Sequence, residues 1–108
     1  MKALTNTVRP EPFTILDAAT AVRFDGPTLQ DFPCPIILFD HVWMKTAGFP
    51  PHPHAGLCIV SYLLEDSPGA LRDRDSVNSE VIVEPGDVLW FQTASGIIHE
   101  ENPARDGI

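Results

Sequence analysis

Prolines and glycines interrupt this chain so often that long helices have little room. The 108 residues include 11 prolines and 7 glycines, and proline breaks a helix and the interior of a sheet alike. The segments between these breaks are short and apolar or alternating, which is typical of β-strands. The sequence therefore predicts an all-β barrel or sandwich built from short strands.

The expected elements follow from these breaks. The predicted strands cover residues 36–39, 56–65, 70–73 (a weak one), 79–84, 87–93 and 97–102. A turn is expected at Asp66–Gly69. Residues 16–24 predict either a short helix or a strand with a turn, and residues 25–35 predict a loop.

Length and composition indicate one soluble domain. A chain of this length is close to the commonest domain size, and its hydrophobic fraction of 44% is enough for one core. It has no apolar run of the roughly 18 residues that a membrane span needs, and its start lacks the apolar core of a secretory signal. We therefore expect an intracellular protein, cytoplasmic or nuclear, without a membrane partner.

The net charge bears on nucleic-acid binding, and the cysteine positions bear on the role of the two thiols. The net charge is −8, and such a field repels phosphate backbones, so we expect no direct nucleic-acid partner. The two cysteines lie in different segments, Cys34 in the predicted loop and Cys58 in an apolar run. We expect Cys58 to be a buried thiol.

Two of the four histidines stand one residue apart in "FPPHPHAGLC", residues 49–58. In a strand, His52 and His54 share a face, and the interleaved prolines favour extended backbone. Two imidazoles roughly 7 Å apart along a strand can reach one ion. If the strand continues, the same face runs through Cys58, Val60 and Tyr62, which predicts an apolar cavity behind the pair.

A second pair follows in "GIIHEEN", residues 96–102. His99 and Glu101 share a face if this segment is a strand, while Glu100 points away. Together the two pairs offer three imidazoles and a carboxylate, which suit iron, manganese, nickel, copper, cobalt or zinc. Spacing alone leaves open that these histidines hold nothing, and His41 is expected to have a surface or packing role.

Several segments together resemble the pirins, a branch of the cupin superfamily. They are "PIILFDHV" at 35–42, "GFPPHPHAG" at 48–56, "YLLE" at 62–65 and "PGDVLWFQTASGIIHEEN" at 85–102. The resemblance implies a double-stranded β-helix barrel that holds one divalent metal ion, usually iron. It implies His52, His54, His99 and Glu101 as the ligands, turns at Gly86 and Gly96, and a brace from Asp87.

The resemblance also predicts the domain organisation. Residues 35–108 correspond to a pirin-type cupin domain with both histidine boxes, and residues 1–34 to an N-terminal segment that is partly loop. Pirins usually carry two such barrels, so we expect an incomplete barrel here, closed by another chain in a homodimer or left with an exposed edge. Ala55 and Ser95 stand where the family usually has arginines that would face an anionic or phenolic substrate.

Three functions are compatible with this resemblance. One is an iron-dependent quercetin-type dioxygenase acting on a flavonol-like molecule, with Glu101 as ligand and base and with Val60, Tyr62 and Trp90 or Phe91 around the substrate. The second is a non-enzymatic, metal- and redox-dependent protein-binding cofactor of the transcriptional co-regulator type. The third is a shortened relic without activity.

Overall fold

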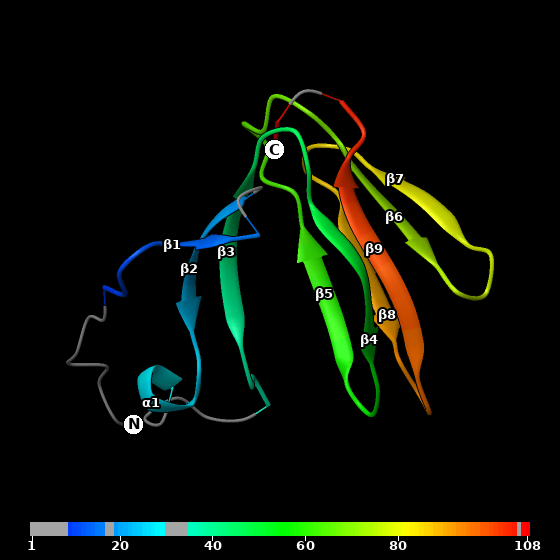
Figure 1. Ribbon diagram of the computed structural model, residues 1–108, viewed down its shortest axis with the longest axis horizontal. Coiled ribbons are helices and arrows are strands. Elements are labelled where there is room, and N and C mark those ends of the chain that lie inside the picture. Colours follow the sequence, from blue (N-terminus) through cyan, green and yellow to red (C-terminus); the bar gives the residue numbers. More distant parts are fainter. Residues whose placement is uncertain (1–8, 17–18, 30–34, 106) are drawn as a thin grey trace. The chain divides into compact units, whose positions relative to one another are not determined.

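The computed structural model describes residues 9–16, 19–29, 35–105 and 107–108 of the chain, which divides into two compact units at Val42 and Trp43 (Figure 1). The described residues form nine strands and one four-residue helix. The prediction of an all-β protein is therefore confirmed.

The first unit, residues 1–42, is built on a three-stranded sheet in the order β1-β2-β3. Its elements are β1 (Phe13–Ile15), β2 (Ala19–Phe24), the short helix α1 (Gly26–Leu29) and β3 (Phe39–Met44), whose last two residues belong to the second unit. Nε and Nη2 of Arg23 donate to the two carboxylate oxygens of Asp40 at 2.8 and 2.7 Å. This paired fork joins β2 to β3.

The structure resolves the open alternative in this unit and corrects one boundary. Residues 19–24 form a strand preceded by a turn at Leu16, so the strand-and-turn alternative is right. The predicted strand at 36–39 is wrong in extent, because pairing begins only at Phe39 and residues 36–38 are exposed. That prediction was based on apolar character alone. The Arg23–Asp40 ion pair, which links β3 to β2, lies after residues 36–38. The predicted loop contains α1, and Cys34 lies outside the described residues.

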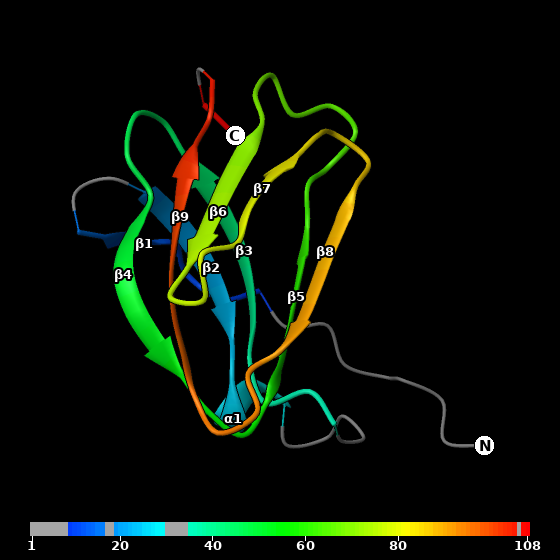
Figure 2. The ribbon, with the colours of Figure 1, turned by 90° about the vertical axis from the view of Figure 1, so that its right-hand side faces the viewer.

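The second unit, residues 43–108, contains two sheets (Figure 2). Four strands form one sheet in the order β4-β9-β6-β7: β4 (Phe49–His54), β9 (Ile97–Pro103), β6 (Leu71–Asp75) and β7 (Glu80–Val83). The other sheet pairs β5 (Cys58–Tyr62) with β8 (Val88–Gln92). Every strand predicted between residues 70 and 102 is present, with ends shifted by one or two residues.

Side chains from the two sheets meet inside this unit. Ser61 of β5 donates to Glu101 of β9, and the ring of Phe91 on β8 contacts that of His99 on β9. The buried apolar residues of the unit are few and are joined by buried polar ones: Met44, Leu63, Ala70, Leu71 and Val83, with Asp73, Thr93 and His99. A polar cluster thus occupies part of what would otherwise be apolar core.

The strand predicted at 56–65 is shorter than expected, and this changes which residues face inward. The chain turns at Ala55–Leu57, where Gly56 has a φ of 73°, so β4 and β5 belong to different sheets. The alternation counted from His54 therefore does not continue into β5. Cys58 and Val60 are exposed, and Ile59 and Ser61 are the partly buried residues. The predictions of a buried Cys58 and of an apolar inner face through Val60 and Tyr62 are wrong.

The predicted turn at Pro85–Asp87 has the expected chemistry. Gly86 has a φ of 91°, a region that favours glycine. Oδ2 of Asp87 accepts a hydrogen bond from the backbone N–H of Glu84 at 3.0 Å. Asp87 therefore braces the turn that leads into β8, as predicted.

Among the described residues, no helix is long and apolar enough to cross a lipid bilayer.

Candidate metal centre

Strand β4 can hold its prolines because it lies at the edge of its sheet. Among the described strands it pairs only with β9, and an edge strand tolerates residues that lack a backbone N–H. Pro51 and Pro53 are exposed, whereas His52 and His54 are partly buried. The two histidines therefore share the inner face, as their spacing predicted.

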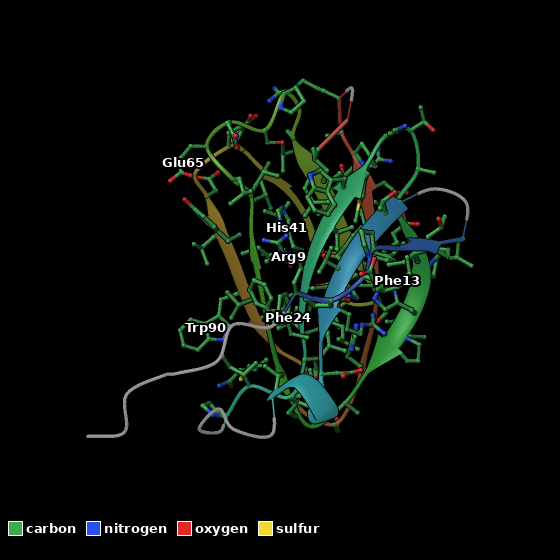
Figure 3. The ribbon with its side chains drawn as sticks, turned by 90° about the vertical axis from the view of Figure 1, so that its left-hand side faces the viewer. Arg9, Phe13, Phe24, His41, Glu65 and Trp90 are labelled. Atoms are coloured by element: carbon green, nitrogen blue, oxygen red, sulfur yellow. The ribbon has the colours of Figure 1, made fainter. Side chains whose placement is uncertain are left out.

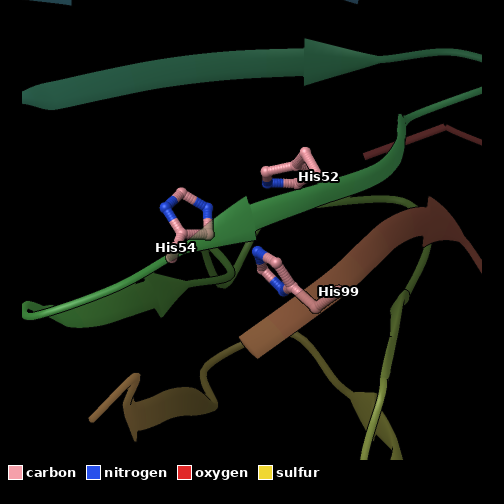
Figure 4. Close-up of side chains that lie close together, drawn as sticks. All are labelled: His52, His54 and His99. Atoms are coloured by element: carbon pink, nitrogen blue, oxygen red, sulfur yellow. The ribbon is translucent and has the colours of Figure 1, made fainter. Parts of the chain in front are cut away.

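Strand β9 brings the third imidazole to the same place. His52 and His99 are direct partners in the β4–β9 register, and such cross-strand neighbours lie close together. The ring centroids are 4.8 Å apart for His52 and His54, 4.5 Å for His52 and His99, and 5.1 Å for His54 and His99. Figure 4 shows the rings of His52 and His54 at β4 close to the ring of His99, which projects from β9. One ligand nitrogen of each lies within 4.8 Å of those of the others.

His99 has one satisfied and one unsatisfied nitrogen. Only 2% of the residue is exposed, and its Nδ1 lies 2.7 Å from Oδ2 of Asp73. Its Nε2 is buried and has no hydrogen-bond partner. A carboxylate can only accept, so in the neutral ring this contact places the proton on Nδ1 and leaves a lone pair on Nε2. A buried atom without a partner costs about 1–3 kcal/mol, and a metal ion would remove that cost.

The other two imidazoles are also suited to binding a metal. Nδ1 of His52 lies 2.8 Å from the carbonyl oxygen of Pro50, which can only accept, so in the neutral ring Nε2 is the free nitrogen. Burial, followed by charge on His52 and His99, lowers the pKa of His54. His54 is therefore neutral at pH 7, and neutral imidazole is the form that binds metals.

Glu101 lies two residues beyond His99 on β9. It belongs to a second group of possible metal ligands, which shares His99 with the histidine cluster. A carboxylate oxygen of Glu101, one of Asp73 and a ring nitrogen of His99 lie within 4.8 Å of one another, whereas the other cluster contains only the three histidines. Oε1 accepts a hydrogen bond from Oγ of Ser61 at 3.2 Å. Burial raises the pKa of Glu101, against the opposing influence of His99. The structure thus brings the three histidines together, and groups Glu101 with His99 and Asp73.

Two residues of this cluster were not predicted from the sequence, Asp73 and Ser61. Asp73 stands in "LRDRD", where Asp73 and Asp75 share a face of β6 by strand alternation. Acidic residues at alternate positions of a predicted strand are the sequence signal that indicates Asp73. Ser61 had no comparable signal, because it lies within an apolar run.

The predicted aromatic surroundings are partly wrong. Val60, Tyr62 and Trp90 are 61%, 46% and 67% exposed and point away from the cluster. The aromatic rings at the site are those of Phe91, 4.9 Å from the ring of His99, and Phe49, 6.0 Å from that of His52. Figure 3 labels Trp90 on the ribbon of β8.

An open groove of about 600 Å³ adjoins His54. Ala55 and Ser95 are among the residues that line it, and its lining contains no lysine, arginine, aspartate or glutamate. The side chains at the two positions where pirins usually have arginine are therefore small and uncharged at this groove.

Comparisons with known proteins agree with the geometry. The family model described as Pirin matches residues 2–107. A pirin-like protein of Caulobacter vibrioides is 32% identical over 96 residues, which is 89% of this chain and 27% of that protein. A Pseudomonas aeruginosa protein named "Putative quercetin 2,3-dioxygenase" is 36% identical over 97 residues, 90% of this chain and 27% of its own length. Human pirin is 38% identical over 73 residues, 67% of this chain and 24% of its own. The chain spans about a quarter of the length of these relatives.

Proposed function

Because the chain belongs to the pirin family, which is a cupin family, we propose that it binds one divalent transition-metal ion at the cluster of His52, His54 and His99, with Glu101 as the carboxylate ligand. The observation that carries this proposal is the buried Nε2 of His99, which has no hydrogen-bond partner. Three imidazoles and one carboxylate suit several ions, and the resemblance to pirins favours Fe(II).

The residues of the cluster would have different roles in such a metal centre. When bound, Fe(II) supplies Lewis acidity and one-electron redox chemistry. Ser61 holds Oε1 of Glu101, and burial raises the pKa of that carboxyl group. Glu101 is therefore suited to accept a proton from a substrate hydroxyl and hold it. Phe91 excludes water from one side of His99.

The enzyme that these features favour is a quercetin-type dioxygenase, which takes a flavonol-like small molecule and dioxygen. The name of the Pseudomonas aeruginosa relative supports this proposal.

The test is flavonol consumption together with oxygen uptake by the Fe(II)-loaded chain. We expect turnover in the wild type and none in His54→Ala, because that change removes an imidazole from the centre of the cluster. His41→Ala is the matched control, since His41 lies on β3 outside the cluster, and it should keep its activity. Metal-loaded wild type without turnover contradicts the dioxygenase proposal but leaves the metal site standing.

An exposed apolar face supports the alternative, a protein-binding role. Val60, Tyr62, Val88 and Trp90 lie on the outer side of the β5–β8 sheet, and each is at least 46% exposed. Apolar patches of this kind mark interaction sites, and the net charge of −8 favours a basic partner. A second copy of the chain is the first partner to test, by sedimentation of wild type and Trp90→Ser. A wild type that sediments as a monomer at all concentrations contradicts the homodimer. A chain that binds neither metal nor a partner fits the third function, a shortened relic without activity.

A further inference from the structure

We infer that Asp73 is a positioning residue, which fixes His99 with the lone pair of Nε2 toward the proposed metal, and that Asp73 is not itself a ligand. This inference rests on the proposed metal site and assigns separate roles within it. It also means that the group of Asp73, His99 and Glu101 is not a second metal site.

The sheet register places Asp73 for this role. Strand β6 lies beside β9, with Asp73 opposite Glu101 and Asp75 opposite His99. Asp73 therefore reaches His99 diagonally, across two neighbouring strands. It is only 7% exposed, and the 2.7 Å separation from Nδ1 is in the range of charge-assisted hydrogen bonds.

The hydrogen-bond partners distinguish the two carboxylates. Oδ2 of Asp73 is engaged at Nδ1, the nitrogen on the side of the ring away from the unsatisfied Nε2. Oε1 of Glu101 instead accepts a hydrogen bond from Ser61. A carboxylate that accepts from the far nitrogen of a ligating histidine fixes its tautomer and strengthens it as a ligand.

The direct test is the tautomer of His99 in the metal-free protein, read from ¹⁵N chemical shifts of the labelled full chain. We expect a protonated Nδ1 and a bare Nε2 in the wild type. A wild type with the proton on Nε2 overturns the inference. Because this measurement uses no metal, it stands even if the proposed metal site proves wrong.

Variants then separate positioning from a general effect of charge. In Asp73→Asn the side chain loses the charge that holds His99, whichever way its amide turns, so we expect Co(II) to bind about 10- to 100-fold more weakly. Asp75→Asn is the matched control. It removes the same charge from the same strand, and its retained oxygen can still accept from the N–H groups of Val77 and Ser79.

We expect Asp75→Asn to match the wild type in both tautomer and Co(II) affinity. The inference is overturned if Asp73→Asn binds Co(II) as tightly as the wild type does. It is also overturned if Asp75→Asn weakens binding as much as Asp73→Asn does. If Asp73→Asn does not fold, the wild-type tautomer decides alone.

Discussion

At the scale of single residues, Glu101 shows how a binding site and a stable fold make opposite demands. Burial raises the pKa of its carboxyl group, and nearby His99 and the hydrogen bond from Ser61 compensate only in part. The folded chain therefore holds the Glu101 proton to a higher pH than the unfolded chain does. Above the ordinary glutamate pKa, ionising this residue costs folding free energy.

Glu101→Gln should therefore stabilise the metal-free protein at pH 7 while weakening its metal binding. Each unit by which a pKa is raised corresponds to about 1.4 kcal/mol, and each kcal/mol raises the Tm of a domain this size by roughly 4–8 °C. Near pH 4 the two proteins should melt alike, because the glutamate is then protonated in both states. Thermal melts at both pH values check this, and a less stable variant at pH 7 contradicts it.

The pH dependence of metal binding follows from the need for deprotonated ligands. The pKa of His54 is lowered by burial and by His52 and His99, so this ligand stays neutral below the ordinary histidine value of about 6.5. Metal affinity should persist at pH 7 and be lost in acid, at the latest as the pH falls through the lowered pKa of His54, because protonated imidazole cannot ligate. Co(II) titrations over a pH series measure this, with His41→Ala expected to follow the wild-type curve. Undiminished affinity at pH 4 is incompatible with a histidine site.

At the scale of elements, the register between β4 and β9 positions the site, and a close backbone contact at Gly48 accompanies it. A Cβ at Gly48 would lie 1.9 Å from the carbonyl oxygen of Glu101. Backbone atoms cannot rotate away from such a contact, as the end of a side chain could. The residue before β4 must therefore be glycine for β9 to keep its place.

Gly48→Ala should lower the free energy of unfolding by about 1–3 kcal/mol, the usual cost of overpacking, and should weaken metal binding by displacing Glu101. Chemical denaturation and Co(II) titration measure the two effects. Gly26→Ala is the control, because a Cβ there would have no neighbour within 4 Å. Equal stability of Gly48→Ala and the wild type would show that β4 and β9 do not pack this closely.

The elements also explain which parts of the site were predictable from the sequence. Strand alternation correctly predicted that His52 and His54 share a face, because it operates within one strand. It failed beyond Gly56, where a turn moves the chain into another sheet. Asp73 was missed because it is 26 residues from His99 in sequence, and only the β6–β9 register brings the two together.

At the scale of the whole molecule, the unit of residues 43–108 carries every residue assigned to the metal centre. The proposed ligands come from β4 and β9, and Asp73 comes from β6 in the same sheet. The net charge of −8 draws cations toward this protein in general. Specific binding must therefore be distinguished from loose attraction by its stoichiometry and by its dependence on the histidines.

The most direct test of the account is the metal content of the full chain, measured by elemental analysis after anaerobic loading with Fe(II) and desalting. We predict one ion per chain in the wild type and none in a variant with both His52→Ala and His54→Ala. A wild type that retains no metal, or a double variant that retains as much as the wild type, would contradict the assignment of the centre.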